Sequence, residues 1–156
     1  YMSSPIHVLT WIRQHASEMV PPIGHKTIWR DDTYEIVVVR GPNTRRDFHI
    51  NSKPEIFYQM RGAVTLRLRI GKHIVEQPIQ EGELFVLPPH VPHSPQRDKG
   101  SWGLVVEQRQ ATHAFMSSCR ICGQDTRTDA RPLTSLDVLE DLIRDAEVCV
   151  QCKSRL

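Results

Sequence analysis

The stretch that decides the fold runs from Gly41 to Gly62 and reads GPNTRRDFHINSKPEIFYQMRG. It places His49, a candidate metal-binding imidazole, shortly before Glu55, a candidate carboxylate ligand, with a proline-containing corner between them. The run IFYQM after Glu55 is rich in β-branched and aromatic residues, which is typical of a strand. The stretch therefore predicts that a β-sheet carries part of a metal site.

Runs of the same kind recur along the chain as YEIVVVR, AVTLRLRI, KHIVEQ, LFVL and WGLVVE, and they are separated by Gly-Pro, Arg-Gly, Gly-Lys and Pro-Pro turns. This rhythm predicts an antiparallel all-β domain. In AVTLRLRI, the apolar residues from Val64 to Ile70 alternate with polar ones, which predicts one buried face. Gly71-Lys72 then predicts a hairpin turn.

The two ends of the chain show helical spacing instead. Residues 5–20 predict an N-terminal helix, with Ser3 and Ser4 available as caps. The strand pattern ends after about Ala111, and residues 133–148 have apolar residues at helical spacing.

These patterns predict two parts of the chain. Residues 1–112 would form a β-barrel domain with its N-terminal helix, and residues 113–156 a small metal-binding tail.

The balance of charge points to a small-molecule partner. Lys and Arg total 20 against 18 Asp and Glu, a net charge of +2. The two signs are interspersed, so no broad field would attract nucleic acid or anionic lipid. No apolar run is long enough to span a membrane, and the first residues lack the layout of a secretory signal, so we expect a cytoplasmic protein.

The spacing of glycines and candidate ligands resembles the two cupin motifs. They read G-x5-D-x-H-x5-E-x6-G through Gly41, Asp47, His49, Glu55 and Gly62, and G-x5-P-x4-H through Gly82, Pro88 and His93. The resemblance implies a jelly-roll barrel of two antiparallel sheets, the double-stranded β-helix. Where cupins usually have their first histidine, this chain has Asp47.

That departure leaves His49, Glu55 and His93 as a 2-His-1-carboxylate facial triad, the ligand set of non-haem Fe(II) oxygenases. Such a triad leaves open positions on the ion, so an aromatic ligand and O2 can both reach it. The alternative is that His49 and His93 are surface or hydrogen-bonded histidines. Four other histidines, expected to be solvated or structural, are His7, His15, His73 and His113, and His90 is either a loop residue or a neighbour of the site.

Three charged residues flank the predicted ligands: Arg45, Arg97 and Glu107. Strand alternation can turn such side chains toward one cavity. Two guanidiniums near one metal favour a substrate with a carboxylate, because arginine offers a rigid fork that matches it. Arg67 and Arg69 are expected to be solvated instead.

The four cysteines form two CxxC pairs, Cys119/Cys122 and Cys149/Cys152. This spacing predicts two knuckles that close a four-thiolate site for iron or zinc. Such a site has no open position, so its expected role is to staple the tail. The alternatives are a redox dithiol or two disulfides.

The runs GPNTRRDFH, EIFYQMRG, LPPHVPHSPQR and LVVEQRQ carry a closer resemblance, to the bacterial 3-hydroxyanthranilate 3,4-dioxygenases. It implies iron ligands at His49, Glu55 and His93, substrate-binding arginines at Arg45 and Arg97, and an active-site glutamate at Glu107. It also implies a rubredoxin-like cysteine site far from catalysis and a homodimer.

The implied reaction converts 3-hydroxyanthranilate and O2 to 2-amino-3-carboxymuconate semialdehyde, which cyclises to quinolinate in tryptophan degradation through kynurenine. One departure bears on substrate preference, because His25 stands where the family has an asparagine on a loop near the pocket. The alternatives are the same Fe(II) chemistry on a related aminophenol or catechol carboxylate, or a non-catalytic cupin that binds a small anion.

Overall fold

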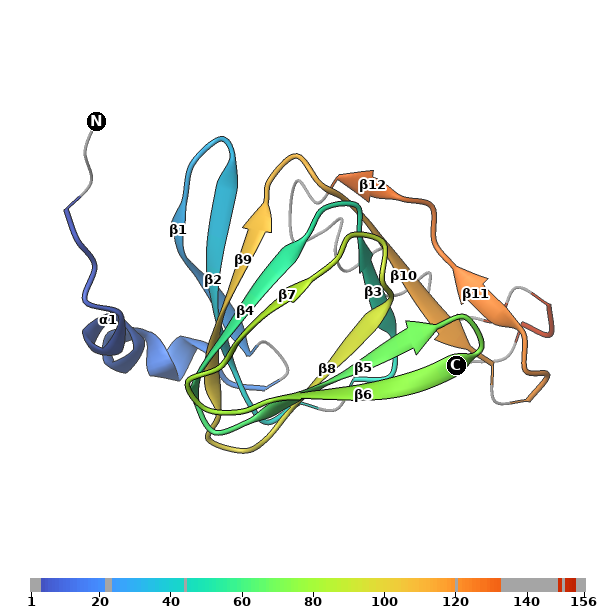
Figure 1. Cartoon of the computed structure of the whole chain (residues 1–156), viewed down its shortest axis with the longest axis horizontal. Helices are drawn as coiled ribbons and strands as arrows, with labels where there is room; N and C mark the ends of the chain where they lie inside the picture. The colour runs from blue at the N-terminus through green and yellow to red at the C-terminus, as the bar shows by residue number, and fades with distance from the viewer. Residues whose placement is uncertain are drawn as a thin grey trace.

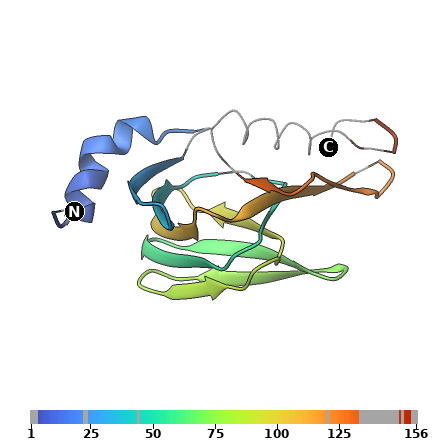
Figure 2. The same ribbon diagram turned by 90° about the horizontal axis from the view of Figure 1, so that it is seen from above.

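The protein is a barrel of two antiparallel β-sheets with a short helix outside it (Figures 1 and 2). It is described by a computed structural model over residues 4–21, 24–43, 45–119, 121–132, 149 and 151–153. The first sheet has five strands in the order β1 (His25–Arg30), β2 (Tyr34–Arg40), β9 (Trp102–Gln108), β4 (Glu55–Arg61) and β7 (Leu84–Leu87). The second runs β11 (Asp125–Arg127), β10 (Thr112–Ser118), β3 (Phe48–Asn51), β8 (His93–Arg97), β5 (Val64–Ile70) and β6 (His73–Ile79), with β12 (Arg131–Pro132) beside β10. The predicted all-β two-sheet barrel is confirmed.

Each of the six strand-like runs in the sequence forms a strand, but six further strands were not predicted: β1, β3, β8, β10, β11 and β12. The expectation that the strand pattern ends near Ala111 is wrong, since β10 follows at once and pairs with β3. The segment THAFMSS mixes polar, small and aromatic residues, and three of its consecutive residues are buried, so it shows no alternation.

β10 also crosses the boundary expected between residues 112 and 113. That division stays a prediction, and the helix expected at 133–148 lies outside the described residues.

Two apolar clusters hold the barrel together. One fills its interior, from Phe57, Val64, Leu66, Ile79, Leu87 and Val105. The other lies between the helix and the outer face of the five-stranded sheet, and is centred on Ile12, Met19 and Val38. Neighbouring residues on β2 therefore face opposite sides, with Val38 toward the helix and Val39 toward the interior.

The predicted N-terminal helix is confirmed as α1 (Val8–His15), followed by the short η1 (Ala16–Glu18), and in Figure 1 it lies outside the barrel beside β1 and β2. It begins later than its serines suggested. His7 is the N-cap, and its ring nitrogen accepts the backbone N–H of Thr10 at 3.3 Å. At the other end, the Arg40 guanidinium donates to the Ala16 carbonyl at 3.0 Å and anchors the helix to the sheet. In the described part of the chain, no helix has the length and apolar character needed to cross a membrane.

The predicted hairpin is confirmed as β5 and β6, paired from Val64↔Ile79 to Ile70↔His73. Its apolar alternation does not run to the end of β5. Leu66 is fully buried, whereas Ile70 beside the turn is 51% exposed. Arg69, expected to be solvated, donates to the carboxylate of Asp125 in an ion pair of 2.6 Å and so ties the hairpin to β11.

This contrast generates a stability prediction. Leu66→Ala should lower the free energy of unfolding by about 3 kcal/mol, because it leaves a cavity in the packed interior. Ile70→Ala, on the same strand, should cost less than about 1 kcal/mol. Urea unfolding of both variants measures the difference, and equal losses would contradict the placement of Leu66 in the core.

Candidate metal centre

The three predicted metal ligands come from both sheets of the barrel. His49 on β3 and His93 on β8 are direct register partners. Glu55 is the first residue of β4, in the opposite sheet. The centre is therefore assembled across the barrel interior and not along one strand.

The corner between β3 and β4 brings Glu55 back toward His49. The side-chain oxygen of Asn51 accepts the backbone N–H of Lys53 at 2.9 Å, which closes the turn. The side-chain amide of Asn51 then donates to Glu55 Oε1 at 2.9 Å. One buried asparagine thus shapes the turn and orients the carboxylate.

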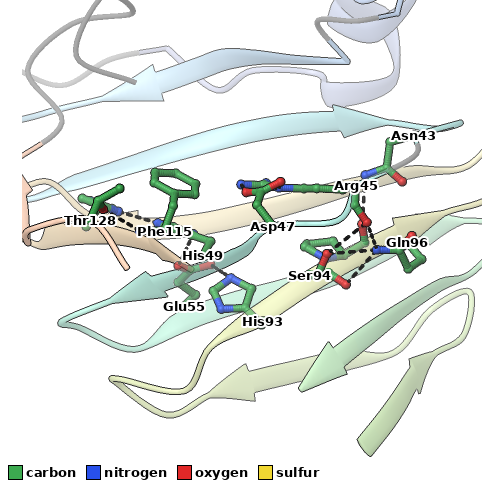
Figure 3. A network of polar contacts seen from close by, with 12 residues as sticks. Asn43, Arg45, Asp47, His49, Glu55, His93, Ser94, Gln96, Phe115 and Thr128 are labelled. Atoms are coloured by element: carbon green, nitrogen blue, oxygen red, sulfur yellow. Dashed lines mark hydrogen bonds and ion pairs between the residues drawn. The ribbon is translucent and has the colours of Figure 1, made fainter. Parts of the chain in front are cut away.

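The ligand atoms converge at one point (Figure 3). Nδ1 of His49 lies 3.4 Å from Glu55 Oε1, and Nε2 of His93 lies 3.2 Å from Glu55 Oε2. The three ligand atoms all lie within 4.8 Å of one another, and all three residues are buried. Two imidazoles and one carboxylate in this arrangement match the facial triad that binds a divalent transition metal.

Burial and mutual charge set the protonation of these groups. Burial alone would raise the pKa of Glu55, but the His93 and His49 rings and hydrogen bonds from His93 and Asn51 bring it below its ordinary value. Burial lowers the pKa of His49 well below its usual range, against the pull of Glu55. An ionised carboxylate beside a neutral imidazole is the state that ligates a metal.

Asp47, which replaces the first histidine of the cupin motif, does not join the ligand cluster. Its carboxylate accepts hydrogen bonds from Arg45 Nε at 3.0 Å and Arg45 Nη2 at 2.7 Å. The Arg45 guanidinium also lies over the Phe115 ring, 5.5 Å from its centroid. Asp47 and Phe115 thus position Arg45 beside the metal ligands (Figure 3).

The loop that carries Arg45 is joined to β8. The Arg45 carbonyl accepts hydrogen bonds from Gln96 Nε2 at 3.0 Å and from Ser94 Oγ at 3.4 Å (Figure 3). The backbone N–H of Arg97 donates to Asn43 Oδ1 at 2.7 Å. Because β8 also carries His93, these bonds fix both arginines relative to a metal ligand.

Arg97 is a buried cation, 8% exposed. Burial and the nearby Arg45 guanidinium lower the pKa of Arg97 to about 10, so it stays charged at neutral pH. Gly103 on β9 makes room for it, since a Cβ there would lie 3.3 Å from Arg97 Nη1. A buried guanidinium is suited to bind a carboxylate.

Glu107 lies on the interior face of β9, two residues after the core residue Val105, and is the register partner of Glu35 on β2. Burial raises the pKa of Glu107 well above its ordinary value, and the negative charges of Glu55 and Glu35 raise it further. The positive charge of Arg45 lowers the pKa of Glu107 in part. The barrel therefore holds a carboxyl group of raised basicity close to the candidate metal centre.

Three buried or half-buried polar residues of this region were missed by the sequence analysis: Glu35, Asn51 and His113. Only Glu35 gave a signal, because it interrupts the apolar run YEIVVVR on the face shared with Val37 and Val39. Thr27 on β1 donates a hydrogen bond to Glu35 at 2.5 Å.

His113 is 4% exposed and is hydrogen-bonded to His49, so it is not solvated. The other candidate histidines lie elsewhere: His7 caps α1, His15 stacks on Trp11, His73 is exposed on β6, and His90 is exposed in a turn. His25 is exposed at the start of β1, within the electrostatic influence of Arg45 and Glu35.

The four cysteines form a second cluster, with all sulfur atoms within 4.8 Å of one another. The sulfur atoms of Cys119 and Cys152 stand 3.6 Å apart and those of Cys122 and Cys149 3.5 Å, which is too far for disulfide bonds. Each CxxC forms a knuckle in which the next residue has positive φ and donates its backbone N–H to the first cysteine's carbonyl, from Gly123 at 2.9 Å and Lys153 at 3.0 Å. Two such knuckles match a closed tetrahedral thiolate site.

Solved structures of other proteins share this barrel. A crystal structure of a Neisseria meningitidis protein gives a TM-score of 0.52 at 17% identity and covers 67% of this chain and 99% of its own. A cupin-2 domain containing protein from Shewanella frigidimarina gives 0.51 at 19% identity, covering 63% of this chain and 92% of its own. The fold and the His-Glu-His cluster define the protein as a cupin with a candidate metal centre.

Sequence comparisons give the family. The family model described as 3-hydroxyanthranilic acid dioxygenase matches residues 1–144. A Xanthomonas campestris pv. campestris (strain 8004) protein named 3-hydroxyanthranilate 3,4-dioxygenase is 43% identical over 158 residues, 95% of this chain and 89% of that protein. A protein of the same name from Jannaschia sp. (strain CCS1) is 39% identical over 143 residues, 89% of this chain and 78% of that protein. The chain belongs to the 3-hydroxyanthranilic acid dioxygenase family, as its sequence motifs predicted.

The pairing of two carboxylates generates a prediction about protonation. Glu35→Gln removes a like charge beside Glu107, so the ionised form of Glu107 becomes less unfavourable and its pKa falls. Carbon-13 NMR of side-chain-labelled glutamate, with the Glu107 signal assigned through Glu107→Gln, measures this pKa. Glu76→Gln, on the exposed part of β6, is the control and should leave it unchanged. An unchanged Glu107 pKa in Glu35→Gln would show that the two groups do not interact.

Proposed function

We propose that the protein is an Fe(II)-dependent ring-cleaving dioxygenase that converts 3-hydroxyanthranilate and O2 to 2-amino-3-carboxymuconate semialdehyde. The observation that carries the proposal is the convergence of His49, Glu55 and His93 inside a barrel that also holds two guanidiniums. Membership of the family supports the substrate and the reaction. Both oxygen atoms enter the product, so no other reductant or oxidant is required.

The donor set supports iron at the catalytic position. Two neutral imidazoles and one carboxylate would remove a single unit of the ion's charge and leave positions open on it. A bound Fe(II) ion would supply the redox chemistry that lets O2 react with an aromatic ring. His49, Glu55 and His93 would hold that ion.

Arg45 and Arg97 would bind the substrate's carboxylate. Arg45 is already paired with Asp47, so an incoming carboxylate would share that guanidinium, while Arg97 offers a second, buried one. A 2-aminophenol with a neighbouring carboxylate has its polar groups on adjacent ring positions. Two fixed guanidiniums would therefore orient its ring toward the triad and reduce the entropy lost on reaching the reactive geometry.

Glu107 would accept the proton that the substrate's hydroxyl group releases on binding. Burial and the charges of Glu55 and Glu35 raise the pKa of Glu107, which makes its ionised form a stronger base than an exposed carboxylate. The substrate would bind as a phenolate, with its proton retained inside the barrel on a Glu107 oxygen. Glu107 thus has a role in proton transfer that is separate from metal ligation.

A second candidate is the same chemistry on a related aminophenol or catechol carboxylate. It is favoured by Glu35 and Thr27, a hydrogen-bonded polar pair on β1 and β2 next to Glu107, and by His25 at the start of β1. These groups would hydrogen-bond a ring substituent that differs from the amino group of 3-hydroxyanthranilate. Relative kcat/KM for 3-hydroxyanthranilate and 2,3-dihydroxybenzoate separates the two candidates.

We also propose an iron or zinc ion on Cys119, Cys122, Cys149 and Cys152, supported by their knuckle geometry. Four thiolates would close its coordination shell, so this ion would stabilise the chain and not take part in catalysis. The family resemblance further supports a cytoplasmic homodimer.

The central prediction concerns activity. Protein loaded with Fe(II) without air, then mixed with 3-hydroxyanthranilate and aerated buffer, should consume one O2 per substrate and develop the absorbance of the semialdehyde. Glu55→Ala should lose the catalytic iron and the activity together, because it removes the only anionic ligand. No product at full iron occupancy would overturn the substrate assignment, and unchanged iron content in Glu55→Ala would remove Glu55 from the ligand set.

A further prediction separates carboxylate binding from chemistry. Arg45→Ala should raise KM for 3-hydroxyanthranilate about tenfold to a hundredfold, the effect of losing a charge-assisted hydrogen bond, with a smaller change in kcat. With 2-aminophenol, which lacks the carboxylate, parent and variant should differ by less than about twofold. Arg30→Ala, an exposed position on β1, is the control. Equal losses on both substrates would mean that Arg45 does not bind the carboxylate.

A further inference from the structure

His113 is joined to a candidate metal ligand by a short hydrogen bond that the proposed chemistry does not use. It lies on β10, next to β3, and its Nδ1 is 2.7 Å from Nε2 of His49. The two ring planes are 3° from parallel, and their centroids are 5.0 Å apart. Rings with those separations lie end to end in nearly one plane, so the lone pair of the accepting nitrogen points at the other ring.

This contact bears on which nitrogen of His49 can ligate a metal. Nδ1 of His49 faces Glu55, so it is the atom that must be unprotonated in a metal complex. In a neutral ring the proton is then on Nε2, which donates to Nδ1 of His113. The hydrogen positions follow from this network and leave His113 as the acceptor.

The second imidazole ligand has an outer partner of another kind. Nδ1 of His93 donates to the carbonyl of Val91 at 3.1 Å and leaves Nε2 free toward Glu55. A backbone carbonyl can only accept a hydrogen bond, so the Val91 carbonyl permits one tautomer of the His93 ring. His113 performs the same task for His49 with a neutral ring, which adds no negative charge around the ion, unlike a carboxylate partner.

The position of His113 is fixed independently of any metal. It is the register partner of Asn51, the residue that orients Glu55 at the corner between β3 and β4. Phe115, two residues on, lies against His49 with ring centroids 5.1 Å apart. His49 is therefore contacted by two side chains of β10, only one of which can accept a proton.

We propose that His113 is a positioning residue that holds His49 in the tautomer and ring orientation in which Nδ1 ligates the catalytic metal. The proposal rests on the proposed metal-dependent function of the same site. His113 touches neither metal nor substrate in this role, and it acts through His49 alone.

The test measures metal binding without turnover. With Zn(II) first bound to the cysteine site, Co(II) alone is titrated into parent, His113→Phe and His113→Asp against a chelating indicator, and its visible and EPR spectra are recorded. His113→Phe should weaken Co(II) binding about tenfold to a hundredfold and change the spectra, because the acceptor is lost. His113→Asp should recover the affinity, since a carboxylate accepts the same proton. His73→Phe, at an exposed position on β6, is the matched control.

Two outcomes would overturn the proposal and leave the proposed function standing. One is unchanged Co(II) affinity in His113→Phe while Glu55→Ala abolishes binding. The other comes from nitrogen-15 NMR of the histidine rings in the parent protein, with Zn(II) bound at both the cysteine site and the His49 site. This measurement does not depend on whether a variant folds. Nδ1 of His49 should be the metal-bound atom and Nε2 should carry the proton, and the reverse assignment would refute the inference. If Glu55→Ala also binds Co(II) normally, the metal centre itself is refuted.

Discussion

The structure depends on a buried carboxylate that meets two imidazoles from the opposite side of the barrel. Glu55 is 2% exposed and would be costly to ionise there without its neighbours. The rings of His49 and His93 and the amide of Asn51 surround it and lower its pKa. This meeting of groups constrains both sheets, because the strands must bring three polar side chains to one point inside the barrel.

The charged groups around this point are divided between the two sheets. Arg45 and Arg97 are cationic, and β8 links both of them to His93. Glu107 and Glu35 face the interior from the other sheet. A substrate with an acidic substituent and a proton to lose would find a partner for each, so electrostatics would orient the proposed substrate before any reaction.

The parts of the fold that the sequence predicted are those where packing alone determines the pattern. β2, β4, β5 and β9 contain apolar runs, and each was expected from its residues. β3 and β8 were missed because they carry the site, so that FHIN and HSPQR turn polar side chains inward and show no alternation. The metal ligands were nevertheless predicted, because their spacing resembles a family motif.

The neighbours of those ligands were not predictable in the same way. Asn51 contacts Glu55 four residues away, but only through the turn between β3 and β4. His113 contacts His49 across a sequence separation of 64, which only the folded barrel closes. Glu35 shows its role only through a strand register that joins β2 to β9. A single sequence contains no record of these pairings, which depend on how the sheets close.

β10 also links the two candidate metal sites. It carries His113 and Phe115 behind His49, and it ends one residue before Cys119, the first sulfur of the cysteine cluster. A metal ion bound by the cysteines at that end would suppress fraying of β10. Without it, fraying would begin only a few residues from His113, the hydrogen-bond partner of His49. The cysteine cluster would thus stabilise a strand whose side chains contact a candidate metal ligand.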